Sequence, residues 1–265
     1  MHLLRLQRGA CNMRSIVFSK RTVKEILRDP LSYIFCLGFP IVMLIIMTIV
    51  DQSIPKEAGM EIFHINKLAP GIALFGLSFI MLFTCLQVSK DRSTAFILRL
   101  YASPMKSGDF IAGYTLPVLL LTVLQAMITF LTSVVIGNFV DYQFELINIL
   151  VCILVLIPSA LVFISFGIFF GTLLNDKAAP GICSIIITAS SMLGGIWMDV
   201  DTIGGAFARF CHVLPFYQGV RSARLALEGS FGEMAKPALI TFVYGIVIYI
   251  FAVFVLKRKM QQDIK

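Results

Sequence analysis

Charged side chains are scarce in this 265-residue sequence. Asp, Glu, Lys and Arg make up only 14% of the residues, whereas hydrophobic residues make up 58% and the mean hydropathy is +0.90. A water-soluble domain of this length could not bury so much apolar surface in one core, so part of that surface must face lipid. The composition therefore excludes an ordinary soluble enzyme and predicts an integral membrane protein.

The motifs that carry common enzyme chemistry are also absent. The sequence has no GxxxxGK[ST] loop to cradle ATP phosphates, no GxSxG and no HExxH. Its three histidines are scattered, and its six cysteines show neither a CxxC pair nor the Cys/His spacing of a zinc site: Cys11, Cys36, Cys85, Cys152, Cys183 and Cys211. We predict no catalytic residue, no metal site and no cofactor bound by this chain, so energy for any transport must come from another protein.

Ionisable residues are missing from the centres of the long apolar runs. A proton- or ion-coupled carrier keeps such residues in its membrane spans for function, although they are costly there. Gln87 and Gln125 are the polar exceptions, and an interhelical hydrogen bond is the role we expect for each. The pattern favours a transporter driven by a partner, while an ion- or proton-coupled carrier remains an alternative.

The apolar runs predict an all-α membrane protein with six transmembrane helices. Their expected bounds are Tyr33–Val50, Ala69–Val88, Phe110–Ile136, Leu146–Leu174, Ala178–Trp197 and Pro237–Leu256. Between the last two, Ile203–Val213 and Phe216–Leu227 have helical apolar spacing but are too short and too polar to cross a bilayer. We expect them to be short re-entrant helices in the outer half of the membrane.

The basic residues predict the orientation. Sixteen of the 22 Lys and Arg residues fall in segments 1–28, 90–106, 177 and 257–265, which alternate along the predicted topology. By the positive-inside rule these segments face the cytoplasm, so both termini are expected inside a plasma-membrane protein. A charge set distributed in this way also argues against nucleic-acid binding. No cleavable signal peptide is predicted, because a long charged segment precedes the first apolar run.

The predicted organisation is one transmembrane domain spanning residues 1–265. It consists of a cytoplasmic amphipathic segment (1–30), a six-span bundle (31–256) and a cytoplasmic tail (257–265). In the first segment, apolar residues share one helical face: Ile16, Val23, Ile26 and Leu27. Arg21, Lys24 and Arg28 lie elsewhere around the helix, and Asp29-Pro30 ends it. This pattern predicts an interfacial amphipathic helix, with a merely basic tail as the alternative.

The stretch Lys90–Gly113 is the polar, basic interruption between the second and third apolar runs. Because the chain has no ATP-binding loop, we expect this cytoplasmic stretch to dock a separate ATPase. Apolar Leu100 and the turn at Pro104 would be unnecessary in a loop that only fixes orientation. A solvated basic loop with that single role is the alternative.

Three places resemble the permease subunits of type-2 ABC exporters, which include daunorubicin-resistance-like, teichoic-acid and polysaccharide exporters. Lys24–Pro30 is similar to the family's basic helix followed by D/N-P. Residues 95–104, AFILRLYASP, resemble the family's G-T-L-E-R-L-x-x-T-P: Arg99, Leu100 and Pro104 match, Ser103 replaces Thr, and Ala95, Phe96 and Leu98 differ. Leu214-Pro215-Phe216-Tyr217, followed by Arg221 and Arg224, resembles the segment between the last two spans.

The resemblance implies roles for these residues. Residues 94–102 would form a cytoplasmic coupling helix, in which Arg92 and Arg99 pair with acidic groups of the ATPase and Leu100 and Tyr101 provide a buried anchor. Ser103 and Pro104 would end that helix. The interfacial-helix residues would flank the contact: Arg21, Lys24, Arg28, Asp29 and Pro30. An outer gate would contain Pro215, Tyr217, Arg221 and Arg224.

The resemblance also implies partners and an activity. Two ABC ATPase subunits would bind ATP and Mg, and the chain would form a homodimer or a heterodimer with a similar permease in the lipid bilayer. The expected function is export of a drug, antibiotic peptide, lipid or similar amphipathic substrate, as in multidrug efflux, along spans 2 and 5. A non-transporting scaffold or immunity protein is an alternative. A lipid-modifying enzyme using Asp199, Asp201 and His212 is a weaker one.

Overall fold

The computed structural model describes residues 19–25, 28, 30, 34–55, 61–93 and 107–262. Within these ranges the chain is helical and contains no β-strand, so the predicted all-α class is confirmed there. Five helical stretches are long and apolar enough to cross a membrane: Ile34–Ser53, Ile65–Arg92, Gly113–Gly137, Leu146–Leu173 and Phe231–Lys259. The chain is therefore a multi-pass membrane protein.

Each of these stretches lies in a helix whose ends fall within one residue of the predicted span or extend beyond it. A π-helical turn, η1 (Ile34–Gly38), leads into α3 (Phe39–Ser53). The other long helices are α4 (Ile65–Ser93), α6 (Ser107–Gly137), α7 (Leu146–Leu173) and α12 (Phe231–Gln262). A short 3-10 turn, η3 (Glu61–Phe63), precedes α4.

The fifth predicted span is shorter than expected. Helix α8 (Ala179–Leu193) has 15 residues, which at 1.5 Å per residue is about 22 Å, less than the roughly 30 Å of a bilayer core. It stops because Gly194 and Gly195 form a turn, and Gly195 has a φ of +72°, which favours glycine. The apolar run to Trp197 thus includes a turn, and the six-span layout remains a prediction.

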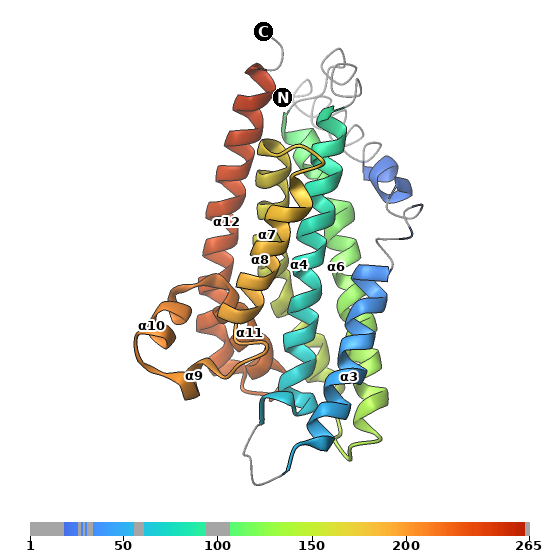
Figure 1. Ribbon diagram of the computed structural model, residues 1–265, viewed down its shortest axis with the longest axis vertical. Helices are drawn as coiled ribbons and strands as arrows, with labels where there is room; N and C mark the ends of the chain where they lie inside the picture. Colours follow the sequence, from blue (N-terminus) through green and yellow to red (C-terminus); the bar gives the residue numbers. More distant parts are fainter. Residues whose placement is uncertain are drawn as a thin grey trace, which may run out of the picture.

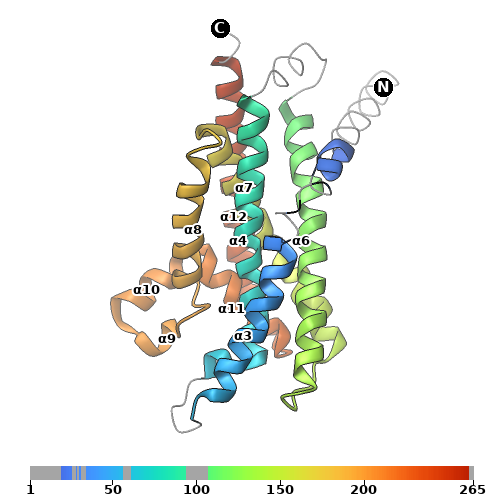
Figure 2. The same cartoon turned by 45° about the vertical axis from the view of Figure 1, so that its right-hand side comes forward.

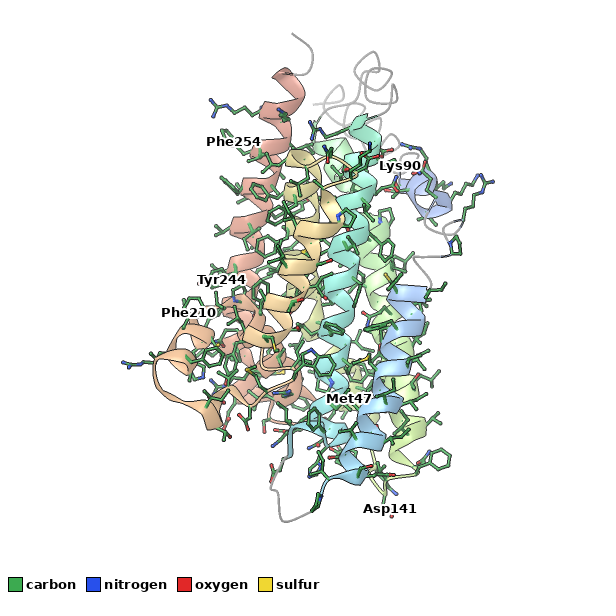
Figure 3. The ribbon with its side chains drawn as sticks, in the orientation of Figure 1. Met47, Lys90, Asp141, Phe210, Tyr244 and Phe254 are labelled. Atoms are coloured by element: carbon green, nitrogen blue, oxygen red, sulfur yellow. The ribbon has the colours of Figure 1, made fainter. Side chains whose placement is uncertain are left out.

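Helix α4 is the centre of the bundle. The long helices run roughly along the long axis, with α7, α8, α6 and α3 around α4 (Figures 1 and 2). In the most apolar part of α4, 72% of the residues are buried, against 17% in that of Ile34–Ser53 and 22% in that of α12. Helices α3 and α12 therefore offer most of their surface to lipid; Phe254 of α12, for example, is 57% exposed (Figure 3).

Small residues allow α7 to pack tightly on α4. A Cβ atom added to Gly171 would lie 2.6 Å from the carbonyl oxygen of Cys85, and one added to Gly167 would lie 2.7 Å from that of Met81. These distances are too short for any side chain, so backbone lies against backbone along this contact. Helices α4 and α7 are therefore closely fitted to one another.

The two ends of the bundle differ in charge. We call the end with Lys90 the basic end; α6 and α8 begin there and α12 finishes there (Figures 1 and 3). Its described basic residues are Lys20, Arg21, Lys24, Arg28, Lys90, Arg92, Lys177, Lys257, Arg258 and Lys259, against the acidic Glu25, Asp91, Asp109 and Asp176. The opposite end, marked by Asp141 in Figure 3, has a mixed set in which acidic residues predominate.

Three short helices lie towards the opposite end, near the start of α12 (Figure 1). They are α9 (Val200–Ile203), α10 (Gly205–Val213) and α11 (Pro215–Leu227). The last two correspond to the short helices expected from the sequence between the fifth and sixth spans. Helix α11 is the best buried of the three and packs against α7, α12 and α4.

Candidate functional site

Most of the predicted ATPase-docking residues lie outside the described part of the chain. These are Arg99, Leu100, Tyr101, Ser103 and Pro104, and Asp29 of the predicted interfacial helix is also outside it. The structure does describe both helices that flank this segment. Helix α4 ends at Ser93 and α6 begins at Ser107, both at the basic end (Figure 2).

A buried carboxylate lies at the end of α4, just before residues 94–106, which we call the predicted docking segment. Asp91 is 4% exposed and accepts hydrogen bonds from the Tyr114 hydroxyl of α6 (2.7 Å) and from Nη2 of Arg21 (2.9 Å). We predicted from the sequence that Asp91 lies in a loop after Val88, but α4 continues past Val88 for more than one further turn. A buried charge requires such partners, so Asp91 joins α4, α6 and the N-terminal segment in one cluster.

Arg21 and Gln87 extend this cluster to Glu25. Arg21 pairs with Glu25 at 2.7 Å, and Nε2 of Gln87 donates to Oε2 of Glu25 at 2.6 Å. Burial alone would lower the pKa of the Arg21 guanidinium, but its bonds to Asp91 and Glu25 outweigh burial and raise it. Arg21 therefore faces the bundle, whereas Lys24, Arg28 and Pro30 are exposed.

Arg92, the next residue along, contacts the end of α7. Its Nη1 donates to the carbonyl oxygen of Thr172. The last carbonyls of a helix have no partner within it and carry partial negative charge, so a cation there is stabilising. The structure thus places Arg92, which we predicted to steer the ATPase, as a link from the end of α4 to the end of α7.

A cavity of about 660 Å³ opens beside this cluster. Its polar wall includes Arg21, Glu25, Gln87, Asp91 and Tyr114, and its apolar wall includes Ile80, Phe83, Val118 and Leu121. The cluster is therefore bordered by free volume on one side and by the packed helices on the other.

A second polar site lies at the opposite end and centres on Arg224 of α11. Its Nε donates to the carbonyl of Lys67 (3.1 Å) and its Nη2 to the carbonyl of Gly195 (2.9 Å). One guanidinium thereby joins α11 to the start of α4 and to the turn after α8. Of the other predicted gate residues, Pro215 and Tyr217 are buried and Arg221 is exposed.

Tyr217 completes a network with Asp201 and His212. The Tyr217 hydroxyl donates to Asp201 (2.6 Å), Nε2 of His212 lies 2.8 Å from the same carboxylate, and the two rings stack. Burial would raise the pKa of Asp201, but these hydrogen bonds and the charge nearby lower it. Among the described residues no three His, Cys, Asp or Glu side chains could hold a metal together.

The comparison with protein families identifies the chain. A family model described as ABC-2 type transporter matches residues 15–227. The chain belongs to this family. Its members are typically the non-catalytic membrane components of ABC-type transporters, and membership implies association with the membrane and with an ABC ATPase. A search of curated proteins found no match.

Sequence reasoning missed parts of both sites in this ABC-2 chain. Asp91 lies four residues after Gln87, a helical spacing that could have marked it as a continuation of α4. The sequence gives no sign of the contacts made by Tyr114 and Thr172. A tyrosine in an apolar run is ordinary, and a contact with a backbone carbonyl leaves no pattern in the sequence. The predicted interhelical bond of Gln125 is confirmed: its Nε2 donates to the carbonyl of Ala73 in α4.

Proposed function

We propose that the chain is the permease subunit of an ABC exporter that moves an amphipathic substrate, such as a drug, antibiotic peptide or lipid, out across the plasma membrane. Two copies of a separate ATPase, which bind ATP and Mg, supply the energy. The permease works as a homodimer or with a similar permease. Family membership, together with the lack of an ATP-binding loop in the chain, supports this assignment.

The hydrogen-bonded cluster at the base of segment 94–106 carries the proposal. Asp91 and Arg92 end α4 immediately before that segment, and they contact the N-terminal segment, α6 and α7. A displacement of the segment by an ATPase is therefore transmitted to several helices at once. Arg99, Leu100 and Tyr101 make the contact with the ATPase, and Ser103 and Pro104 end the coupling helix.

The orientation of the proposed exporter follows from its charges. The basic end faces the cytoplasm, which puts both termini inside and allows the exposed Lys24 and Arg28 to contact lipid head groups or the ATPase. Helix α12 lies beyond the matched region yet packs against α7 and α11, which supports a single domain over residues 1–265.

The exit lies at the opposite end. Helices α10 and α11 dip into the outer half of the bilayer, and Pro215, Tyr217, Arg221 and Arg224 belong to the gate. Substrate moves between two permeases along α4 and α8. Helix α8 supports this path because Gly181, Ser184 and Thr188 are exposed on the side turned away from the buried residues that face α4. The apolar surroundings suit amphipathic cargo, as in daunorubicin-resistance-like multidrug efflux.

Co-purification tests the proposal. The tagged chain is extracted from native membranes in mild detergent, and co-purifying proteins are examined for a P-loop ATPase and for ATP hydrolysis. Leu100→Asp removes the ATPase from the preparation, because a charge replaces the apolar anchor, while the amount of inserted chain is unchanged. Ile203→Asp, the same kind of change on an exposed residue of α9, keeps the ATPase. Equal ATPase recovery with both variants contradicts the docking role.

One observation favours a second candidate, an ion- or proton-coupled carrier. The predicted second span ended at Val88 and left Asp91 outside it. In the structure Asp91 is a buried ionisable residue inside a helix long enough to span the membrane. Its pairing with Arg21 gives it a structural role as well. Transport by the purified chain in vesicles lacking any ATPase and driven by a pH gradient is the result that selects the carrier.

A further inference from the structure

The cavity at the basic end is polar at its mouth and apolar further in. Its volume of about 660 Å³ lies within the range of small-molecule sites. The N-terminal segment, α4 and α6 provide most of its walls. On α4 the lining runs from Ile80 to Asp91, about 16 Å along the axis, and the residues at helical spacing share one face: Ile80, Phe83, Thr84, Gln87 and Asp91.

Polarity changes along this wall in one direction. Asp91 and Lys90 lie at the end of α4, and Figure 3 marks the level of Lys90. Deeper in the bundle the walls are apolar at Phe83 of α4 and at Val118 of α6. A small soluble anion would leave the apolar wall in contact with water, which is unfavourable. An amphipathic molecule fits both parts, with its head group at the basic end and its apolar part towards the middle of the bundle. A lipid of the adjacent membrane leaflet has this orientation.

The charges at the mouth indicate the kind of head group. Among the described lining residues, three are basic and three are acidic: Arg21, Arg28 and Lys90 against Glu25, Asp91 and Asp176. Arg21 pairs with both Glu25 and Asp91, so these three charges are largely satisfied within the cluster. The exposed charges at the mouth are Arg28, Lys90 and Asp176. Two cations and one carboxylate complement a phosphate joined to an ammonium group.

We propose that this cavity binds a zwitterionic phospholipid of the phosphatidylethanolamine class. Its phosphate contacts Arg28 and Lys90, its ammonium contacts Asp176, and an acyl chain lies against Phe83 and Val118. A lipid in this position contacts the N-terminal segment, α4 and α6 together, and so stabilises the arrangement of all three. The site depends on the cavity and its charges and does not require the proposed transport function.

Lipid binding to the full-length chain tests the class of ligand. The purified chain is stripped of lipid in detergent, and bound ligand is measured by native mass spectrometry. Dioleoyl phosphatidylethanolamine is expected to bind about tenfold more tightly than dioleoyl phosphatidylglycerol, because the latter lacks the ammonium that pairs with Asp176. Glycerophosphoethanolamine and inorganic phosphate, which have no acyl chain, should bind more weakly still. Equally tight binding of phosphatidylglycerol, or of either ligand without chains, overturns the proposal.

Two pairs of variants test the position of the site. Arg28→Gln should weaken phosphatidylethanolamine binding about tenfold, whereas Lys24→Gln should not, because Lys24 is exposed on the same segment but does not line the cavity. Leu86→Trp fills the cavity and should also weaken binding. Leu82→Trp is its control, since Leu82 is half-buried on the same helix and does not line the cavity. Equal binding by the two members of the Arg28 and Lys24 pair overturns the site, even if a tryptophan variant fails to fold.

A photoactivatable phosphatidylethanolamine with a diazirine in its acyl chain locates the apolar part. The expected links are to peptides that contain Phe83 or Val118. Links confined to the lipid-facing surface of α12 show general contact with membrane lipid and overturn the site. All of these readouts are independent of an ATPase. A native complex that contains no ATPase therefore refutes the proposed function and leaves the lipid site established by its own measurements.

Discussion

The arginine at the centre of each polar site makes a different kind of bond at the two ends of this membrane bundle. At the basic end, Arg21 pairs with Glu25 four residues along its own segment and with Asp91 seventy residues further on, beside a cavity. At the opposite end, Arg224 donates to backbone carbonyls. Side-chain pairs can exchange partners when helices move, whereas a guanidinium bound to two backbone carbonyls holds fixed positions. Under the proposed function, we therefore expect movement at the basic end and closure at the other.

Removing the central carboxylate should have the largest effect. Asp91→Asn leaves Arg21 without its buried partner, and we expect a loss of about 2–3 kcal/mol in stability, below the full cost for a buried pair because Arg21 is partly exposed. The measurement is thermal unfolding in detergent. Asp176→Asn, an exposed acid at the same end, is the control and should change stability little. Equal effects of the two variants would show that the cluster does not hold the basic end together.

A smaller effect is expected at the opposite end from Arg224→Lys. Lysine cannot reproduce the two divergent N–H bonds to Lys67 and Gly195, so the change should cost about 1–2 kcal/mol. Arg221→Lys, one turn earlier and exposed, should be neutral. Thermal unfolding separates them, and an Arg224→Lys protein as stable as the native one would remove the distinction between the ends.

The smallest effect concerns pH. The pKa of Asp201 is lowered in the folded protein, so folding favours its ionised form. The contribution of this carboxylate to stability is therefore present above the ordinary carboxyl pKa and is lost as the pH falls through the lowered pKa. Because Asp201 is largely exposed, about 0.5 kcal/mol is expected. Asp201→Asn should be less stable than the native protein at pH 7, with the gap closing below about pH 4. A difference in stability between the two proteins that grows as the pH falls would contradict this prediction.

The long helices were predicted well from the sequence because polar residues at both ends of each apolar run mark its limits. Helix α7 was expected at Leu146–Leu174 and lies at Leu146–Leu173, since Asn175-Asp176-Lys177 follows it. Helix α8 was predicted too long, because hydropathy cannot reveal the turn at Gly195 inside an apolar run. Both sites were only partly foreseen. Arg224 binds backbone carbonyls, and Arg21 meets Asp91 across seventy residues, so neither contact has a sequence pattern.

Cross-linking of the native complex tests the central claim most directly. A lysine-reactive reagent is applied to the chain with its co-purified ATPase, and the linked lysines are mapped by mass spectrometry. We predict links to a P-loop ATPase from Lys90, beside the predicted docking segment, and from Lys106 within it, and none from Lys67 or Lys236 at the opposite end. Links from Lys67 or Lys236, or a complex without any linked ATPase, would contradict it.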